Sequence, residues 1–584
     1  MMQSNGTSRW QIPRHQLADI AYVVLVLSIG AWFVSPVFDE PHAWGSTRDW
    51  GYFTFLEEVT RKSVVEFRQF PLWNPYYFGG AEHLANPQTT ILSPTSLLTT
   101  SLGTALGLKV GVLCFALLGC SGMYALARYF GCRPQAAAAS AIVYGCSGWF
   151  AQHVGGGHWG FAAVSLFPFV VLFLLRSEKS PWFMVPAVAL GVWVAVHWGI
   201  YPLPWLFMLT LLVTAAEFVR TKRSAIWRRF ALFVLFTLSL AAARLIPVAE
   251  YVSRFPRGVA ISDRLSPADI LHVFLGHQAN RDVVGHPYEW PEYGNYIGWM
   301  TLALLVHGCK MRFPRKKMLW SGVVVFIALT LGSWGSGSPF ALLHGLPLFE
   351  NLRVPSRYTL LVVFFFALIA GLALSSLLDA CARRWDGPRA NATRHLVGLG
   401  VVLAIACDAI ATNRGEFRQS FHLAPPTDDV SDSFVQRRGD PLRMFAYPRA
   451  NQGSVRGLEE SPIPRAAGIW IDGGDQHRLT NQGSARATYW SPNVLRYSIE
   501  TDVPNAIVIN QNYRPEWRAS GDAVIAETNG LLTVLVPPGH HELQLEYSPN
   551  RMGTLVSLVG IPVLLLWAHQ TRRRTSRDGE DVRT

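Results

Sequence analysis

A long polar segment reads PVFDEPHAWGSTRDWGYFTFLEEV at residues 36–59 and FRQFPLWNPYYFGGAEHLANPQTTILSPTSLL at residues 67–98. It is rich in carboxylates, aromatic rings, proline and glycine. The apolar runs on either side, at 17–35 and 106–127, are long enough to cross about 30 Å of hydrocarbon as helices. A polar loop that carries acids at the mouth of a membrane bundle is the first place to expect chemistry.

Apolar runs recur along the rest of the chain. The 584 residues are 50% hydrophobic and include 21 Trp and 33 Phe, an unusual combination for a soluble protein of this size. We therefore predict a polytopic α-helical membrane protein with about twelve transmembrane helices. They are expected at 17–35, 106–127, 136–150, 160–175, 182–198, 201–219, 229–248, 296–309, 318–333, 356–379, 395–412 and 553–569.

The charge pattern orients these helices. The net charge is +12, but the basic residues lie in short loops between apolar runs, which indicates the positive-inside bias and no nucleic-acid partner. The cytoplasmic loops are expected at 128–135, 176–181, 220–229, 309–317, 382–394 and 569–578. The outer side then receives 36–105, 151–159, 249–295, 334–355 and 413–552. Both termini are predicted to be cytoplasmic, with membrane lipids as partners.

The predicted domains follow from this topology. Residues 1–412 form a transmembrane domain whose first outer loop is 36–105, and 413–552 form an extracytoplasmic soluble domain. From residue 489 onward polar and apolar residues alternate between turn signals, which predicts a small β-sandwich at the end of that domain. A last transmembrane helix at 553–569 and a basic cytoplasmic tail at 570–584 complete the chain.

Carboxylates of the first outer loop are candidate catalytic groups. Asp39 and Glu40 directly follow the first helix, and Asp49 comes ten residues after Asp39. A carboxylate at this boundary can act as a general base toward an acceptor hydroxyl. The alternative is that these acids are solvated or pair with Arg48 or Arg61.

The stretch PLWNPYYFGGAEHLANPQ at 71–88 is a candidate substrate surface. Trp73 and Tyr76 suit an interfacial aromatic belt or stacking against a sugar ring. Asn74 and Gln88 offer amide donors and acceptors. The alternative is an interfacial re-entrant loop without a ligand.

Cationic side chains form a second group of candidates. His153 and His158 flank GGG in a short outer loop, where they could bind phosphate or metal, or be satisfied locally. Four arginines lie on the predicted outer side, at or just beyond helix ends, against the positive-inside pattern: Arg244, Arg257, Arg353 and Arg357. Such a cluster suits an anionic lipid phosphate. Ion pairs with Glu250 or Glu350 are the alternative.

Several chemistries find no support in the sequence. Walker A, HExxH and GxSxG motifs are missing, and the seven cysteines show no metal-ligand spacing. The sequence predicts no cofactor, and a divalent cation stays open. Asp408 lies within an apolar run, either in a polar pathway or as a buried hydrogen-bonded acid.

Seven blocks together resemble the YfhO family of bacterial membrane proteins, in order from about residue 40 to 568. They are DWGYF (49–53), PLWNPYYFGGAEHLANPQT (71–89), GGGHWGF (155–161), RLIPVAEY (244–251), EYGNYIGW (292–299), LRVPSRYTLL (352–361) and NYRPEW with VPPGHHELQLEYSP (512–517, 536–549).

This resemblance implies a GT-C glycosyltransferase of the bacterial cytoplasmic membrane with its active site on the outer side. Such an enzyme transfers a sugar from a polyprenyl-phosphate donor to a glycan, polymer or lipid acceptor. The resemblance makes Asp49 the catalytic acid, with Asp39 and Glu40 in reserve, and gives the donor phosphate to Arg353, Arg357 and Arg257 or Arg244. His158, Glu250 and Tyr296 lie in matching blocks and join Trp73, Asn74, Tyr76 and Gln88 as expected substrate contacts. A lipid or polysaccharide transporter or flippase, or a non-catalytic scaffold for envelope assembly, are the alternatives.

Overall fold

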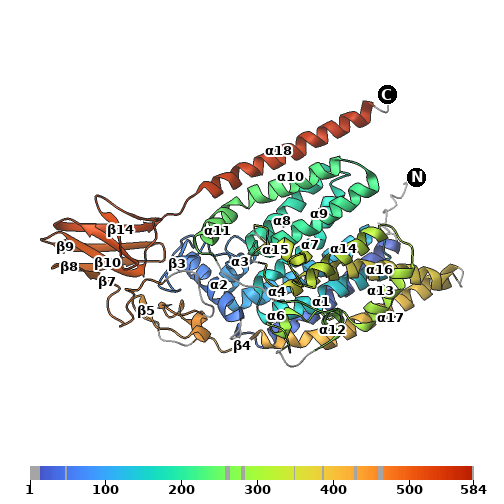
Figure 1. The fold of residues 1–584 in the computed structure, drawn as a ribbon, viewed down its shortest axis with the longest axis horizontal. Coiled ribbons are helices and arrows are strands. Elements are labelled where there is room, and N and C mark those ends of the chain that lie inside the picture. The colour runs from blue at the N-terminus through green and yellow to red at the C-terminus, as the bar shows by residue number, and fades with distance from the viewer. Residues whose placement is uncertain are drawn as a thin grey trace, which may run out of the picture.

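A helical bundle carries a β-rich region at one end, and helix α18 runs from that region back along the bundle (Figure 1). This computed structural model describes residues 14–45, 49–256, 263–277, 283–347, 349–350, 352–383, 387–426, 430–457 and 465–581. Arg48 and Arg257, both named above as candidates, lie outside the described residues.

The helices in chain order are α1 (Arg14–Val34), α2 (Asp49–Val65), α3 (Thr95–Leu102), α4 (Thr104–Tyr129), α5 (Pro134–Gly145), α6 (Gly148–Gly156), α7 (Phe167–Arg176), α8 (Met184–Trp198), α9 (Pro202–Thr221), α10 (Ala225–Leu240), α11 (Ala242–Arg254), α12 (Pro267–Leu275), α13 (Trp299–Lys310), α14 (Lys316–Thr330), α15 (Pro339–His344), α16 (Thr359–Ala382), α17 (Gly387–Asn413) and α18 (Met552–Asp581).

Eight helical segments of the described chain are long and apolar enough to cross a membrane, and the bent pair of α10 and α11 would make nine. The eight are Gln16–Phe38, Thr104–Tyr129, Trp159–Arg176, Pro181–Trp198, Pro202–Thr221, Pro355–Ala382, Arg389–Gln419 and Met552–Arg573. The predicted count of twelve is not confirmed. Helices α5 and α13 have only 12 residues each, about 18 Å of helix against about 30 Å of hydrocarbon. Every residue of α5 from Gln135 onward is buried, so α5 is an internal packing helix.

The polar segment that follows α1 is more ordered than the predicted loop. It contains α2, a 17-residue helix that is buried over most of its length. Glu57 on α2 accepts hydrogen bonds from Thr90 and from Thr99 (2.8 Å), and burial raises the pKa of Glu57. Arg61 donates to Glu58 at 2.8 Å. These polar contacts allow an acid-rich helix to pack inside the protein.

Two four-stranded antiparallel sheets form the β-rich region. One has the order β12-β13-β10-β7 and the other β11-β14-β9-β8. Their strands are β7 (His477–Leu479), β8 (Ser484–Trp490), β9 (Val494–Thr501), β10 (Asn505–Asn512), β11 (Trp517–Ala519), β12 (Val524–Thr528), β13 (Leu531–Val536) and β14 (Gly539–Tyr547). Apolar side chains from both sheets, such as Leu495, Ile507 and Leu545, share one core. The alternating pattern thus predicts these strands correctly.

Short strands join the β-rich region to the segment before α3. They are β1 (Trp44–Gly45), β2 (Trp73–Asn74), β3 (Ala81–Glu82), β4 (Phe421–Leu423), β5 (Val435–Arg437) and β6 (Gln452–Ser454). Trp73 is fully buried in the core of the β-rich region, where its indole N–H donates to Gln511 at 2.7 Å. Asn512 donates to the carbonyls of Phe78 (2.9 Å) and Gly80 (2.7 Å). Segments far apart in sequence therefore build one outer structure.

Candidate active site

Four charged side chains from distant parts of the chain meet in one cluster. Asp49 opens α2, and its Oδ2 lies 2.9 Å from Nε2 of His158. The same nitrogen lies 3.7 Å from Oε1 of Glu292, in the short helix η4 (Trp290–Glu292). Arg357, in η5 (Pro355–Tyr358), donates from Nε to Glu292 at 2.7 Å and also from Nη2. We call these four residues the Asp49 cluster.

The backbone around Asp49 explains why His158 reaches it. The indole N–H of Trp50 donates to the carbonyl of Gly155 at 3.2 Å, which ties α2 to the end of α6. Gly157 has a φ of 108°, a left-handed conformation that favours glycine. A Cβ at Gly157 would stand 3.0 Å from the Cβ of Asp49. The glycine run therefore allows the close approach that brings His158 beside the carboxylate.

Exposure decreases through the cluster from one end to the other. The side chain of Asp49 is 34% exposed, that of His158 16%, that of Glu292 13% and that of Arg357 8%. Among the described residues, Oδ1 of Asp49 accepts no hydrogen bond. Asp49 thus presents a free carboxylate oxygen at the open end of a chain of buried charges.

The charges of the cluster set its protonation. Burial alone would lower the pKa of His158, but the carboxylates of Glu292 and Asp49 outweigh burial and raise it. Burial alone would raise the pKa of Glu292, but the charge of Arg357 holds it below its usual range. Both carboxylates are therefore matched by a cation when His158 is protonated.

A second histidine completes the hydrogen bonding of His158. Nδ1 of His153 lies 2.9 Å from Nδ1 of His158. Burial holds the pKa of His153 well below its ordinary value, so this ring is neutral. The protonated His158 can therefore donate from Nδ1 to His153 and from Nε2 to Asp49, which fixes the orientation of its ring.

Aromatic rings cover Arg357. Its guanidinium carbon lies 4.9 Å from the ring centre of Phe161 and 5.3 Å from that of Tyr201. These cation–π contacts and the two hydrogen bonds to Glu292 occupy the side chain. The partner is Glu292, and not Glu250 or Glu350, the two partners considered from the sequence.

The other predicted arginines lie outside the cluster. Arg244 is buried and donates to the carbonyls of Leu84, Asn86 (2.6 Å) and Thr89 (2.7 Å). It therefore orders the turn that carries Gln88. Arg353 is half-buried, and its Nε has no hydrogen-bond partner within the described part of the chain.

The remaining predicted contacts are accounted for by packing or lie at the surface. Tyr76 is buried between the rings of Phe434 and Trp490, and its backbone N–H donates to the Asn74 side chain at 3.0 Å. Together with Trp73 these residues attach the β-rich region. Tyr296 donates to Asp408 at 2.7 Å, which satisfies that acid. Gln88 is half-buried and Glu250 is exposed.

The two reserve acids also stand apart from the cluster. Asp39 and Glu40 are exposed directly after α1. The backbone carbonyl of Glu40 accepts a hydrogen bond from Lys109 at 2.6 Å. Within the described residues, neither carboxylate contacts His158, Glu292 or Arg357.

Glu292 is the cluster member that sequence reasoning missed. It begins the block EYGNYIGW, so the block itself was a usable signal. Its partner Arg357 lies 65 positions further along the chain, and no local spacing connects the two.

The cluster does not fit a metal ion. Across the described ranges, no group of three or more His, Cys, Asp or Glu side chains could hold one. Arg357 and His158 already supply positive charge to Glu292 and Asp49. We therefore assign no step to a divalent cation.

Comparison with solved structures identifies membrane glycosyltransferases of the GT-C type. The structure is similar to the mycobacterial arabinofuranosyltransferase AftD, with a TM-score of 0.50 and 14% sequence identity, covering 91% of this chain and 40% of AftD. The oligosaccharyltransferase from Archaeoglobus fulgidus gives a TM-score of 0.44, 13% identity and coverage of 75% and 64%. ArnT from Cupriavidus metallidurans gives 0.43, 15% and coverage of 75% and 86%.

These comparisons establish the fold. At 14% identity the likeness to AftD is one of fold alone, and the chain spans less than half of AftD. No protein-family model matches the sequence, and neither does any curated protein. The chain thus has the fold used by membrane glycosyltransferases of the GT-C type.

Proposed function

We propose that the protein is a GT-C glycosyltransferase of the YfhO family that transfers a sugar from a polyprenyl-phosphate donor to an extracytoplasmic glycan, polymer or lipid. The observation that carries this proposal is the Asp49 cluster. It holds one exposed carboxylate in place with buried charges, at the first outer segment of a GT-C-like fold. A base positioned in this way is what glycosyl transfer to a hydroxyl requires.

Asp49 is the proposed catalytic base. Its Oδ1 takes the proton of the acceptor hydroxyl while the acceptor oxygen bonds to the anomeric carbon of the sugar. The bond between that carbon and the phosphate oxygen breaks, and polyprenyl phosphate leaves with the bonding electrons. A single displacement of this kind inverts the anomeric centre.

His158 and Glu292 are proposed positioning residues. The hydrogen bond from His158 holds Oδ2 of Asp49, so Oδ1 faces the acceptor. Glu292 stabilises the imidazolium of His158, and Arg357 neutralises Glu292. This arrangement follows the general logic of a reactive group oriented by a second side chain that a third one supports.

Arg353 is the stronger candidate for the donor phosphate. Arg357 is committed to Glu292 and to two aromatic rings. Arg353 precedes η5 by two residues, and its Nε is free among the described residues. A guanidinium there can stabilise the charge that develops on the leaving phosphate.

A cavity of about 510 Å³ beside the start of α2 is a proposed acceptor site. Trp44, Glu58 and Arg61 line it from the bundle side, and Arg449 lines it from the outer segment 413–552. Strand β1, which contributes Trp44, ends four residues before Asp49. An aromatic ring with carboxylate and guanidinium groups suits a sugar acceptor, which supports a role for the outer domain in holding it.

The test uses the purified full chain with labelled polyprenyl-phosphate sugars and a panel of glycan, polymer and lipid acceptors. We expect the label to move to one acceptor class, with release of polyprenyl phosphate. Movement of intact labelled lipid across proteoliposomes without transfer would replace this proposal with the transporter reading. Neither transfer nor movement, with the labelled lipid still bound, would favour the scaffold.

A further inference from the structure

A basic cavity lies between the end of α9 and the start of α14. Its volume is about 640 Å³. The charged residues that line it are Arg220, Arg312, Arg315, Lys316, Lys317 and Glu217. Five cations thus face a single carboxylate, which leaves a strong surplus of positive charge.

This cavity lies at the membrane face opposite the Asp49 cluster. Helix α9 begins beside Tyr201, whose ring contacts Arg357, and ends at Thr221. Its 20 residues span about 30 Å, the thickness of the hydrocarbon core. The cavity is therefore level with the headgroups of the other leaflet, which the charge pattern predicts to be the cytoplasmic one.

The floor of the cavity is held in place before any ligand binds. Glu217 is buried and accepts hydrogen bonds from Arg220 (2.8 and 2.6 Å) and from Arg315. Arg315 has a φ of 60°, a conformation that a residue with a Cβ rarely adopts. Its guanidinium carbon also lies 5.1 Å from the ring centre of Phe130. These contacts fix the start of α14 relative to α9 and α4.

Two cations at the rim have no partner in the described chain. Arg312 and Lys317 are exposed, and neither makes a hydrogen bond or an ion pair with another described residue. Lys316, in contrast, donates to the carbonyls of Cys309 (2.6 Å) and Met311 (2.8 Å). Arg312 and Lys317 are thus the donors left for an anionic ligand.

An apolar surface continues from the cavity along the helices. Val219 lines the cavity and is 64% exposed. Val324 is 65% exposed and lies three residues beyond Ser321, another lining residue, on the same face of α14. A ligand with a charged head and an apolar tail would contact both parts, whereas a free anion would use the cations alone.

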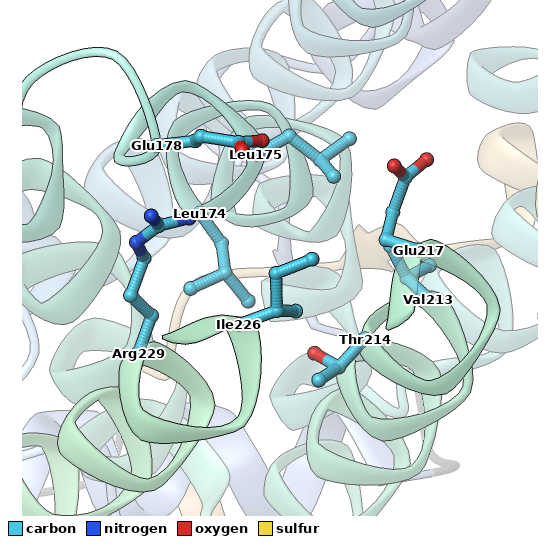
Figure 2. A pocket seen from close by; sticks show the side chains of 8 residues that line it. All are labelled: Leu174, Leu175, Glu178, Val213, Thr214, Glu217, Ile226 and Arg229. Carbon is cyan, nitrogen blue, oxygen red and sulfur yellow. The ribbon is translucent and has the colours of Figure 1, made fainter. Parts of the chain in front are cut away.

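A neighbouring gap does not compete for this ligand. Figure 2 shows it between α7, α9 and α10, with Glu178, Glu217 and Arg229 among its lining side chains. Its volume is about 30 Å³, enough for about one water molecule. Glu217 lines both spaces, so the headgroup is confined to the larger one.

We propose that the cavity between α9 and α14 binds the headgroup of an anionic phospholipid from the leaflet opposite the active site. Basic pockets between membrane helices are suited to such headgroups because each Lys or Arg attracts their charge. The proposal does not depend on the transferase activity, because binding can be measured without any sugar donor.

The test is native mass spectrometry of the full chain in detergent with phosphatidylglycerol or phosphatidylcholine. We expect preferential retention of phosphatidylglycerol by the unaltered protein. The double variant Arg312→Gln/Lys317→Gln should bind it about 30-fold more weakly, since two attractive charges are removed. The matched control Lys179→Gln/Arg228→Gln removes two exposed cations outside the cavity and should retain the lipid.

Three results would overturn the proposal. Equal loss of binding in both double variants would mean that the cavity is not the site. Equal retention of phosphatidylcholine and phosphatidylglycerol would mean that charge is not recognised. Displacement of phosphatidylglycerol by inorganic phosphate at equal concentration would assign the cavity to a free anion. Thermal unfolding of both double variants confirms that they are folded before binding is compared.

Discussion

Replacing Glu292 with glutamine should destabilise the protein more than a single surface charge would. Glu292→Gln keeps the shape of the side chain but removes the charge that matches Arg357, which is 8% exposed. It also removes the first-ranking attraction that raises the pKa of His158. Two cations would then share the single carboxylate of Asp49.

The expected cost follows from the burial of this pair. Removing one partner of a buried ion pair costs about 3–5 kcal/mol, because the other charge stays desolvated. Replacing both partners with uncharged side chains avoids that penalty. The double variant Glu292→Gln/Arg357→Met should therefore be less destabilised than the sum of the two single variants, and the two changes should couple by more than about 1 kcal/mol.

Denaturant unfolding in mixed micelles measures these free energies for the unaltered protein, both single variants and the double variant. The cluster would be energetically unimportant if Glu292→Gln cost less than about 1 kcal/mol, as exposed pairs do. Strictly additive single costs would likewise refute a direct interaction between Glu292 and Arg357.

Four further predictions concern other residues. Transfer activity should fall as pH rises through the raised pKa of His158, because the imidazolium is lost, and any stability that this proton contributes below about pH 6.5 is lost over the same range; His158→Gln should remove this limb from the pH–rate profile. Burial, with a contribution from Arg244, lowers the pKa of His83 to about 3, so the free energy of unfolding should decrease as pH falls from about 6.5, and His83→Leu should flatten this slope. Arg353→Ala should raise the KM for the donor in steady-state kinetics while the free energy of unfolding stays within about 0.5 kcal/mol, whereas equal losses would mean a structural role. Trp73→Ala should cost about 3–5 kcal/mol in unfolding because the indole is fully buried, and limited proteolysis should then cut first in the β-rich region.

Much of the fold could be predicted from the sequence because its signals are local. Alternation of polar and apolar residues identifies strands such as Val494–Thr501, and long apolar runs identify spans such as Thr104–Tyr129. The count of spans could not be predicted, because α5 is apolar enough to resemble a membrane helix but is a short helix buried inside the bundle. Hydropathy does not distinguish protein from lipid as the surroundings of a helix.

The site could be predicted only in part. Asp49, His158 and Arg357 each belong to a sequence block that attracts attention, and the structure brings them together. Glu292 could not be assigned, because its pairing with Arg357 depends on tertiary packing. The acid-rich stretch after α1 also misleads, because threonine and arginine partners bury Glu57 and Glu58 within α2.

The choice among the three acids of the first outer segment is the most direct test of the proposed mechanism. Asp49→Asn keeps the size of the side chain and removes the base, and Asp39→Asn and Glu40→Gln are matched changes at exposed positions outside the cluster. Single-turnover transfer from a labelled polyprenyl-phosphate sugar should fall by about 10²–10⁴-fold in Asp49→Asn, with donor binding retained, and by less than about twofold in the two controls. Full activity of Asp49→Asn, or a larger loss in Asp39→Asn or Glu40→Gln, would contradict the assignment of Asp49 as the catalytic base.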